Sequence, residues 1–258
     1  MVTGGYGVLG SAIARGLGRA GARVAIMGRR SEAARREADA IVDEGGEALW
    51  LVADVLEPEQ VRAASRQLIN EWGQIDILVN AAGGNVARAR SDAISVFDIP
   101  LDAFDEVLKL NLHGTIVPTM VIGEQMAHAK RGTIVNISSM ASLQVLSGVM
   151  GYSIAKAGID NFTRWLAVDL ARRHGDGIRV NAIAPGFFIT TQNRTVLVND
   201  DGSYTERAKN VLRQTPMGRF GHPEELLGAV HWLCSDASSF VTGTVIAVDG
   251  GFSVFSGV

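Results

Sequence analysis

Apolar runs of strand length alternate along the chain with longer segments in which apolar and polar positions mix. The runs are almost continuously apolar, as expected of strands buried on both faces of a parallel sheet. They lie at residues 23–27, 48–53, 76–80, 132–137, 178–183 and 244–248. Helix-like segments lie between and after them, at residues 11–20, 31–44, 58–72, 101–130, 152–174 and 223–235. This repeated order predicts an α/β fold, a single-domain, doubly wound parallel sheet (Rossmann-like) with helices on both faces.

Two stretches depart from the alternation. A first strand should precede the Gly-rich turn near the start, yet only Met1, Val2 and Thr3 are available to build it, so we expect a short central strand. Residues 185–222 look irregular, and an irregular stretch of that length inside a compact domain is usually functional. We therefore predict one domain over residues 1–258, with a substrate lid near residues 186–222.

Composition narrows the function classes. The 258 residues are 47% hydrophobic and 20% charged, as in a compact soluble domain, and nothing in their spacing indicates a metal site. Lys and Arg number 24 against 27 Asp and Glu, which gives no basic surface for nucleic acid or an anionic membrane. The lone Cys234 excludes a disulfide framework. Without a signal-peptide pattern or an apolar run of roughly 20 residues, we predict a cytoplasmic protein.

A Gly-rich turn near the start predicts a dinucleotide site. Gly5-Tyr6-Gly7-Val8-Leu9-Gly10 fits the pattern G-x-G-x-x-G and runs into the helix expected from residue 11. In that setting glycines let the backbone approach a pyrophosphate, and the helix N-terminus attracts the anion. Taken alone, the motif is also compatible with a Gly-rich turn that binds nothing.

The end of the second strand bears on which nicotinamide cofactor binds. NAD sites carry an acidic residue there, whereas this chain has Gly28 followed by Arg29 and Arg30. A guanidinium beside an absent carboxylate suits a 2′-phosphate, which favours NADP and leaves NAD as the alternative. The competing interpretation is that both arginines only solvate the start of a surface helix.

Ser139, Tyr152 and Lys156 form the most specific pattern in the chain. Tyr152 and Lys156 are four residues apart and share one helix face, so the ammonium can stabilise the phenolate of a tyrosine whose ordinary pKa is about 10. Ser139 follows a predicted strand, where it can hydrogen-bond a substrate oxygen that gains charge during hydride transfer. Each residue alone has an ordinary structural explanation.

Together with the Gly-rich turn, these residues resemble the short-chain dehydrogenase/reductase family over essentially the whole chain. The resemblance implies a fourth catalytic residue, Asn111, which holds a water in the proton relay. It also implies adenine contacts at Asp54 and Val55. The chain departs from the family pattern at Val8, which replaces the middle glycine of the phosphate loop, and at Ala81, which replaces an asparagine after the fourth strand. The expected cofactor-binding residues are Gly4, Gly5, Tyr6, Gly7, Val8, Leu9, Gly10, Arg29, Asp54, Val55, Asn80, Ala81, Gly83, Tyr152, Lys156, Pro185, Gly186 and Thr190.

Loops outside the shared core resemble a subfamily, the short-chain fructuronate reductases, also called D-mannonate oxidoreductases. The segments are residues 3–10, 192–194, 215–220 and 248–258. The resemblance implies reversible reduction of a keto-sugar acid. Amide and guanidinium groups suit such a substrate, and Arg194 can bind a carboxylate through two parallel hydrogen bonds. The candidate substrate residues are Asn85, Gln144, Gln192, Asn193 and Arg194, although those of residues 192–194 are equally compatible with the polar surface of a mobile loop.

The family resemblance further suggests a homotetramer built on the helices predicted at residues 101–130 and 152–174, with the apolar tail at residues 252–258 covering a neighbouring subunit. Two other functions stay open. One is a short-chain reductase of another ketone or of a gluconate-type substrate. The other is a dinucleotide-sensing regulator without catalysis, although such a protein could lose Ser139, Tyr152 or Lys156, and all three are present.

Overall fold

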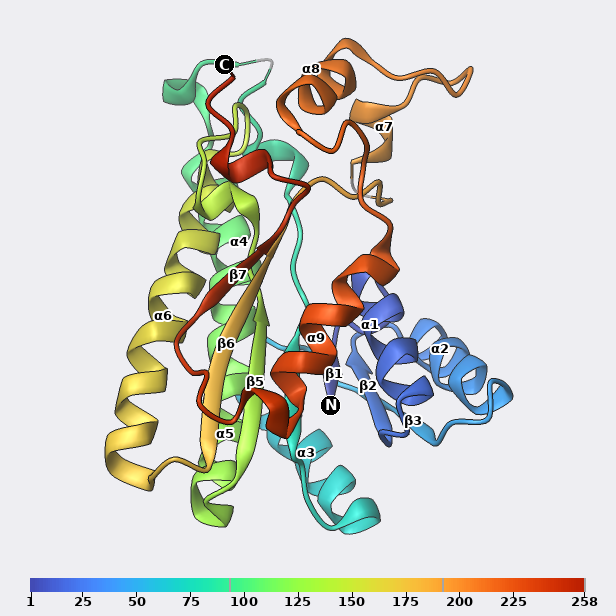
Figure 1. The fold of residues 1–258 in the computed structure, drawn as a ribbon, viewed down its shortest axis with the longest axis vertical. Helices are drawn as coiled ribbons and strands as arrows, with labels where there is room; N and C mark the ends of the chain where they lie inside the picture. The colour runs from blue at the N-terminus through green and yellow to red at the C-terminus, as the bar shows by residue number, and fades with distance from the viewer. Residues whose placement is uncertain (93, 192, 258) are drawn as a thin grey trace.

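The computed structural model describes residues 1–92, 94–191 and 193–257, and within them the chain forms one seven-stranded parallel sheet in the order β3-β2-β1-β4-β5-β6-β7 (Figure 1). The strands are β1 (Val2–Thr3), β2 (Val24–Gly28), β3 (Ala48–Val52), β4 (Ile77–Asn80), β5 (Gly132–Ile137), β6 (Ile178–Pro185) and β7 (Val245–Val248). This architecture confirms the predicted doubly wound α/β fold.

The central strand β1 is as short as the sequence predicted. Val2 pairs with Ile26 on β2 and with Val79 on β4, so β1 lies between the two halves of the sheet. From β1 the chain builds outward to β2 and β3 on one side, then returns to β4 and continues to β7 on the other. The strand order therefore reverses between β1 and β4, and ligands of open α/β sheets bind outside the carboxyl ends of the strands at such a point.

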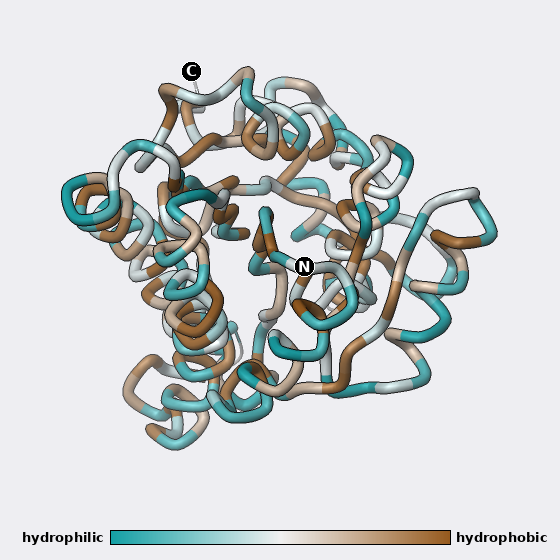
Figure 2. The backbone as a smooth tube through the Cα atoms, turned by 90° about the horizontal axis from the view of Figure 1, so that it is seen from below, coloured by the Kyte–Doolittle hydropathy of each residue, from teal (hydrophilic) through white to brown (hydrophobic). Residues whose placement is uncertain are grey.

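Helices cover both faces of the sheet. The helices are α1 (Val8–Arg19), α2 (Ser31–Asp43), α3 (Pro58–Trp72), α4 (Leu101–Leu108), α5 (Gly114–Ala129), α6 (Met150–His174), α7 (Arg194–Leu197), α8 (Glu206–Gln214) and α9 (Leu227–Cys234). One buried cluster joins α1, α2 and α9 to the sheet, and a second joins α3, α5 and α6 to it. Hydrophobic and hydrophilic residues alternate along the coils of these helices (Figure 2), as expected of helices with one buried face.

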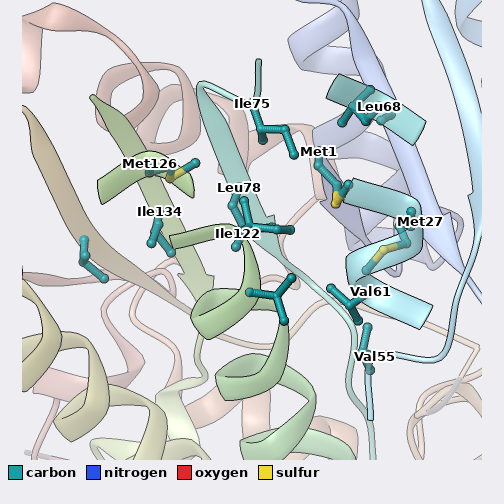
Figure 3. Close-up of a cluster of buried hydrophobic side chains, with 14 of the residues drawn as sticks. Met1, Met27, Val55, Val61, Leu68, Ile75, Leu78, Ile122, Met126 and Ile134 are labelled. Atoms are coloured by element: carbon teal, nitrogen blue, oxygen red, sulfur yellow. The ribbon is translucent and has the colours of Figure 1, made fainter. Parts of the chain in front are cut away.

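The second cluster gives the sheet its rigid base (Figure 3). Met27 on β2, Leu78 on β4 and Ile134 on β5 are fully buried and belong to one cluster with Ile122 and Met126 of α5. Fully burying side chains of this size stabilises a fold by roughly 1.5–3 kcal/mol each. The strand ends that carry the polar residues are therefore held by a close-packed interior.

A buried polar ladder crosses the same part of the sheet. Asn80 and Asn136 pair in register on β4 and β5, and the Asn80 amide donates to Asn136 Oδ1 at 2.9 Å and to Thr119 Oγ1 on α5 at 2.8 Å. The Asn136 amide in turn donates to Thr163 Oγ1 on α6 at 2.9 Å. Two strands and two helices are thus joined by side-chain hydrogen bonds inside the core.

The structure differs from the predicted elements in several places. Helix α1 begins at Val8, three residues earlier than expected. The single helix expected over residues 101–130 is interrupted by a π-helical turn, η3 (Lys109–His113), and such turns are frequent at functional sites. The 185–222 stretch is not irregular throughout, because it contains α7 and α8 with a buried cluster of their own: Leu197, Ala208, Val211 and Phe220.

The two helices of the 186–222 segment lie beyond the upper end of the sheet in Figure 1, the end toward which β6 runs. Helix α8 begins at a residue that caps it, since Thr205 Oγ1 accepts the Ala208 N–H at 3.2 Å. Periodicity is weak over such short helices, so the sequence pattern did not reveal them. Among the described residues, none of the helices combines the length and apolar character of a membrane span.

Candidate active site

The strand β5 and the helix α6 bring Ser139, Tyr152 and Lys156 to the carboxyl edge of the sheet. Ser139 follows β5 in an extended conformation, and its Oγ accepts the Ala141 N–H at 3.1 Å at the start of the short helix η4 (Met140–Ser142). Tyr152 and Lys156 lie one turn apart in the first part of α6, which begins at Met150, two residues earlier than predicted. The spacing that predicted a shared helix face is confirmed.

The electrostatics of this group depend on burial. Burial raises the pKa of Tyr152, and the Ser139 hydroxyl acts in the opposite direction. Lys156 is only 4% exposed, and desolvation lowers its pKa to about 8, while the nearby Asp160 carboxylate opposes that change. Its Nζ donates to Ile137 O at 2.7 Å and lies 5.5 Å from the centre of the Tyr152 ring. At neutral pH Lys156 is thus a cation placed beside the phenol.

Asn111 lies in the π-helical turn η3 and is fully buried. Its side-chain amide donates to Gly84 O at 2.7 Å and to Val107 O at 2.8 Å, and its Oδ1 accepts the Gly84 N–H at 3.0 Å. A methyl group at Gly83 would lie 2.7 Å from Asn111 Oδ1 and 3.6 Å from Lys156 Nζ. The segment after β4 therefore lies against both Asn111 and Lys156, and the four predicted catalytic residues gather at one place.

The Gly-rich turn packs against the same segment. Gly4 has a φ of +63°, and a Cβ there would lie 2.8 Å from the Ala82 Cα. A Cβ at Gly10 would lie 2.4 Å from Gly4 O, so both positions require glycine. Thr3 Oγ1 accepts the N–H groups of Ala81 and Ala82, each at 3.2 Å, which ties the turn to the end of β4.

The start of α1 leaves backbone N–H groups without side-chain partners. Gly7 is its N-cap and makes no side-chain hydrogen bond, and the first turn contains no acidic residue. Val8, the departure from the family's glycine pattern, is simply the first residue of this helix, whereas Leu9 packs against the core. Free N–H groups at the positive end of a helix dipole, beside a cradle that a Cβ would fill, fit the pyrophosphate of a dinucleotide.

Two guanidinium groups follow the end of β2, and the ring of Tyr6 from the Gly-rich turn packs beside them. A Cβ at Gly28 would lie 2.3 Å from Tyr6 Cε1, so glycine there makes room for the Tyr6 ring. The Arg30 guanidinium stacks on that ring at 4.7 Å from its centre. Arg29 Nη1 forms an exposed ion pair with Asp54 Oδ2 at 3.6 Å. The two residues predicted to bind the 2′-phosphate and the adenine are therefore paired with each other.

Three further residues predicted to bind the cofactor, Pro185, Gly186 and Thr190, lie where β6 leads into the 186–222 segment. Pro185 ends β6, and the Gly186 N–H donates to Val248 O at 2.9 Å. A Cβ at Gly186 would lie 2.6 Å from the Asp249 Cα, so glycine permits this close approach of two chain segments. Thr190 is partly buried, and its N–H donates to Asn193 Oδ1 at 2.7 Å.

The structure separates the predicted substrate residues into two kinds. Asn85, Gln144 and Asn193 use their side chains within the protein: Asn85 Oδ1 accepts the Val86 N–H, Gln144 Nε2 donates to Ser253 O at 2.7 Å, and Asn193 Nδ2 donates to Phe188 O at 2.8 Å. Arg194 is exposed at the start of α7, and none of the ion pairs between described residues includes it. Gln192 lies outside the described residues.

The sequence interpretation missed two buried polar residues behind the catalytic group. Asp160 is 3% exposed and Ser138 is 2% exposed, and the Ser138 hydroxyl donates to Asp160 Oδ1. The available signal was an acidic residue on an otherwise buried stripe of a helix, four positions after Lys156. In the C-terminal tail, which the sequence analysis placed against a neighbouring subunit, Phe252 packs on Phe187 of its own chain, with ring centres 5.2 Å apart.

Comparisons with known proteins match this chain over nearly its whole length. Residues 7–253 match the family model described as Enoyl-(Acyl carrier protein) reductase. The uncharacterized oxidoreductase UxuB of Bacillus subtilis is 42% identical, over 100% of this chain and 95% of the relative. The chain belongs to the short-chain dehydrogenase/reductase family and is an oxidoreductase.

Two solved structures carry sugar-acid names. One, from Haemophilus influenzae with bound NAD and provisionally named a D-mannonate oxidoreductase, is 41% identical with a TM-score of 0.93, covering 99% of this chain and 95% of that one. The other, a gluconate 5-dehydrogenase from Burkholderia cenocepacia in complex with NADP and tartrate, is 34% identical with a TM-score of 0.87, covering 97% and 93%. The chain is similar to both.

Proposed function

We propose that this protein catalyses the reversible reduction of a keto-sugar acid to a hydroxy-sugar acid of the fructuronate/mannonate type, with a nicotinamide cofactor. The observation that carries the proposal is the group formed by the buried Asn111, Ser139 and Lys156 with the partly buried Tyr152, beside the glycine cradle. The similarity to a structure provisionally named a D-mannonate oxidoreductase supports the substrate class.

In the proposed mechanism the protein binds, orients and moves a proton. When bound, the nicotinamide supplies or accepts the hydride. The Tyr152 phenol donates a proton to the carbonyl oxygen of the substrate, and the Ser139 hydroxyl donates a hydrogen bond to the same atom. Lys156 stabilises the phenolate that remains, and Asn111 orders the path by which the proton is replaced. In the direction of oxidation each step is reversed.

For the cofactor, the residues from Gly4 to Gly10 bind the pyrophosphate, and Arg29, Asp54 and Val55 lie at the adenosine end. The remaining contacts come from Asn80, Ala81, Gly83, Tyr152, Lys156, Pro185, Gly186 and Thr190. We favour NADP because no carboxylate follows β2, with NAD as the alternative, since relatives bind each of the two. The 3.6 Å pair between Arg29 and Asp54 must open, or share a phosphate, if Arg29 is to select NADP.

For the substrate, Arg194 binds the carboxylate and the 186–222 segment acts as a lid. A guanidinium without an ion-pair partner among the described residues is available for bidentate contact with a carboxylate. Asn85, Gln144 and Asn193 then contribute mainly by holding their loops, because their amides already have partners in the protein. Gln192 stays a candidate from the sequence alone.

We further propose a cytoplasmic homotetramer in which α4, α5 and α6 pack against their symmetry mates. On α6, Trp165 and Val168 are 64% and 59% exposed, and on α5 Met120 is 61% exposed. A recess of about 410 Å³ opens on the same side of α6, lined by Val168, Ala171, Thr242 and other residues. Exposed apolar side chains gathered over helices favour burial in an assembly.

The experiment that tests the proposed function follows nicotinamide absorbance with NADH and NADPH in parallel, against fructuronate, 5-ketogluconate and simple ketones. Oxidation of the cofactor that depends on fructuronate supports the proposal, and the preferred cofactor tests the assignment to NADP. Turnover of 5-ketogluconate alone would instead support a gluconate-type reductase, which the similarity to gluconate 5-dehydrogenase favours as the second candidate. Cofactor binding without turnover of any substrate would indicate a regulator.

A further inference from the structure

A buried carboxylate lies directly behind the catalytic group. Asp160 is 3% exposed on the inner face of α6, one helical turn after Lys156, which is 4% exposed. Ionised side chains are rarely buried to this extent unless they are paired, because removing a charge from water is costly. Lys156 and Asp160 carry opposite charges one turn apart, and the Asp160 carboxylate opposes the effect of burial on the pKa of Lys156.

The contacts of Asp160 lead to the end of the strand that carries the catalytic serine. The Ser138 hydroxyl donates to Asp160 Oδ1, and Ser138 lies between Ile137 and Ser139. Ile137 O accepts the Lys156 ammonium at 2.7 Å. Residues 137 and 138 are thus each hydrogen-bonded to a charged side chain of α6, directly before Ser139.

Other charges near this pair are few. Tyr152 is the titratable neighbour on α6, its ring centre 5.5 Å from Lys156 Nζ, whereas the ends of β5 and η4 present only hydroxyl groups. Arg179 on β6 reaches Thr133 and carbonyl groups at the opposite end of the sheet. The ionisable side chains that α4, η3 and α5 carry are exposed: Asp102, Asp105, Glu106, Lys109, His113, Glu124 and His128. Asp160 is therefore the carboxylate that acts on Lys156 inside the core.

We propose that Asp160 is a positioning residue for this active site: its carboxylate fixes Ser138, and so Ser139, against α6, and its charge keeps Lys156 a cation. The inference rests on the proposed function, because it assigns Asp160 a role in setting up the same proton donor. Asp160 touches neither substrate nor cofactor in this role. It acts through Lys156 and through the backbone of β5.

Two substitutions separate the two parts of this role. Asp160→Asn removes the charge and leaves an oxygen that can accept the Ser138 hydroxyl. Ser138→Ala keeps the charge and removes the hydrogen bond. Ser65→Ala is the matched control, because Ser65 is fully buried on α3 and donates to Gln125 Oε1 at 3.1 Å, away from the catalytic group.

The first readout is the titration of Lys156 by NMR in protein labelled at lysine, without cofactor or substrate. The chain has only four lysines, Lys109, Lys130, Lys156 and Lys209, so the signal can be assigned with one Lys156→Met variant. We expect a midpoint near pH 8 in the parent protein and a midpoint lower by about 1 in Asp160→Asn, because the opposing carboxylate is gone. An unchanged midpoint in folded Asp160→Asn overturns the electrostatic part.

The second readout is the pH profile of kcat with whichever substrate the family assay identifies. In Asp160→Asn the profile for ketone reduction should fall at a pH lower by about 1, in step with Lys156. Ser138→Ala should keep the parent profile and lose about tenfold in kcat with KM unchanged, whereas Ser65→Ala should stay within about twofold. A kcat for Ser138→Ala equal to that of Ser65→Ala overturns the positioning part.

The two proposals fail in different ways. If no substrate is turned over, the proposed function fails while the lysine titration still decides the electrostatic part of the inference. If Asp160→Asn does not fold, Asp160→Glu takes its place: it keeps the charge, so the Lys156 midpoint must stay near pH 8, and a midpoint lower by 1 overturns the inference.

Discussion

The catalytic group and the 186–222 segment differ in what holds their side chains. The catalytic group is set into the main core, where Lys156 and Asn111 are buried and donate to backbone oxygens, and the buried Asp160 accepts the Ser138 hydroxyl. The 186–222 segment has a small core of its own around Leu197 and stays largely exposed. The proposed catalytic residues are thus held by the main core, whereas the segment that we propose as a lid is packed around a separate small cluster.

The largest effect should come from the proton donor. Tyr152→Phe keeps the ring and removes the hydroxyl, so we expect kcat to fall by about 10²- to 10⁴-fold while the Kd for cofactor stays within about threefold. Steady-state kinetics and cofactor fluorescence titration measure both. Unchanged turnover would show that Tyr152 is not the proton donor. The contrast between the catalytic group and the 186–222 segment would then lose its basis.

The next effect should come from the cradle. Gly10→Ala places a Cβ 2.4 Å from Gly4 O, so the turn must shift. Such overpacking costs about 1–3 kcal/mol. We therefore expect the Kd for cofactor to rise about tenfold or more. Gly123→Ala on α5 is the control, because its Cβ would meet Ile134 Cδ1 at an ordinary 3.7 Å. Equal Kd values for the two variants would contradict a cofactor site at the turn.

A matched pair of leucines compares the two cores directly. Leu68 on α3 and Leu197 on α7 are both 1% exposed, one in the main core and one in the 186–222 segment. Leu68→Ala should lower the free energy of unfolding by about 2–5 kcal/mol. Leu197→Ala should instead raise KM several-fold with a small change in Tm, because it favours local opening of the 186–222 segment over unfolding of the whole protein.

Thermal melts and KM values for the two leucine variants test whether the segment is a separate unit. A loss of Tm in Leu197→Ala as large as that in Leu68→Ala would show that both clusters unfold together. The proposal that the 186–222 segment acts as a separate lid would then be contradicted.

The smallest effect is a pH dependence. Lys156 has a pKa of about 8 and loses its charge above that pH, while burial holds the pKa of Tyr152 above its ordinary value, so the phenol stays protonated. For ketone reduction, kcat should therefore be level below about pH 8 and fall a fewfold above it, as the cation that stabilises the phenolate is lost. A rate that rises with pH in this direction would contradict the assigned roles.

Local patterns were enough to predict much of this molecule. The alternating apolar runs predicted the doubly wound parallel sheet, and Tyr152 and Lys156 were found because residues four positions apart on a helix share a face. Contacts between distant segments were not accessible in the same way. Gln144 and Ser253 are 109 residues apart, and a glutamine predicted to contact substrate turned out to hold the tail.

The pairing of Arg29 with Asp54 gives the same lesson at the adenosine end. Each residue was assigned a separate contact with the cofactor, and the fold places them 3.6 Å apart. The π-helical turn at Asn111 was missed because its composition is that of an ordinary helix. Sequence patterns thus predict which residues lie at an edge of the sheet. The hydrogen-bond and ion-pair partners of these residues depend on how distant segments pack, which the patterns do not show.

The buried ladder from Thr119 through Asn80 and Asn136 to Thr163 has a consequence for how the protein reaches an active state. A shift of β4 against β5 by one residue would turn the Asn80 amide to the other face of the sheet and break its bonds to Thr119 and Asn136, at about 1–3 kcal/mol for each buried group left unpaired. Ser139 lies only three residues beyond Asn136. The ladder thus favours the one pairing of β4 with β5 that also fixes where β5 ends and the catalytic serine follows.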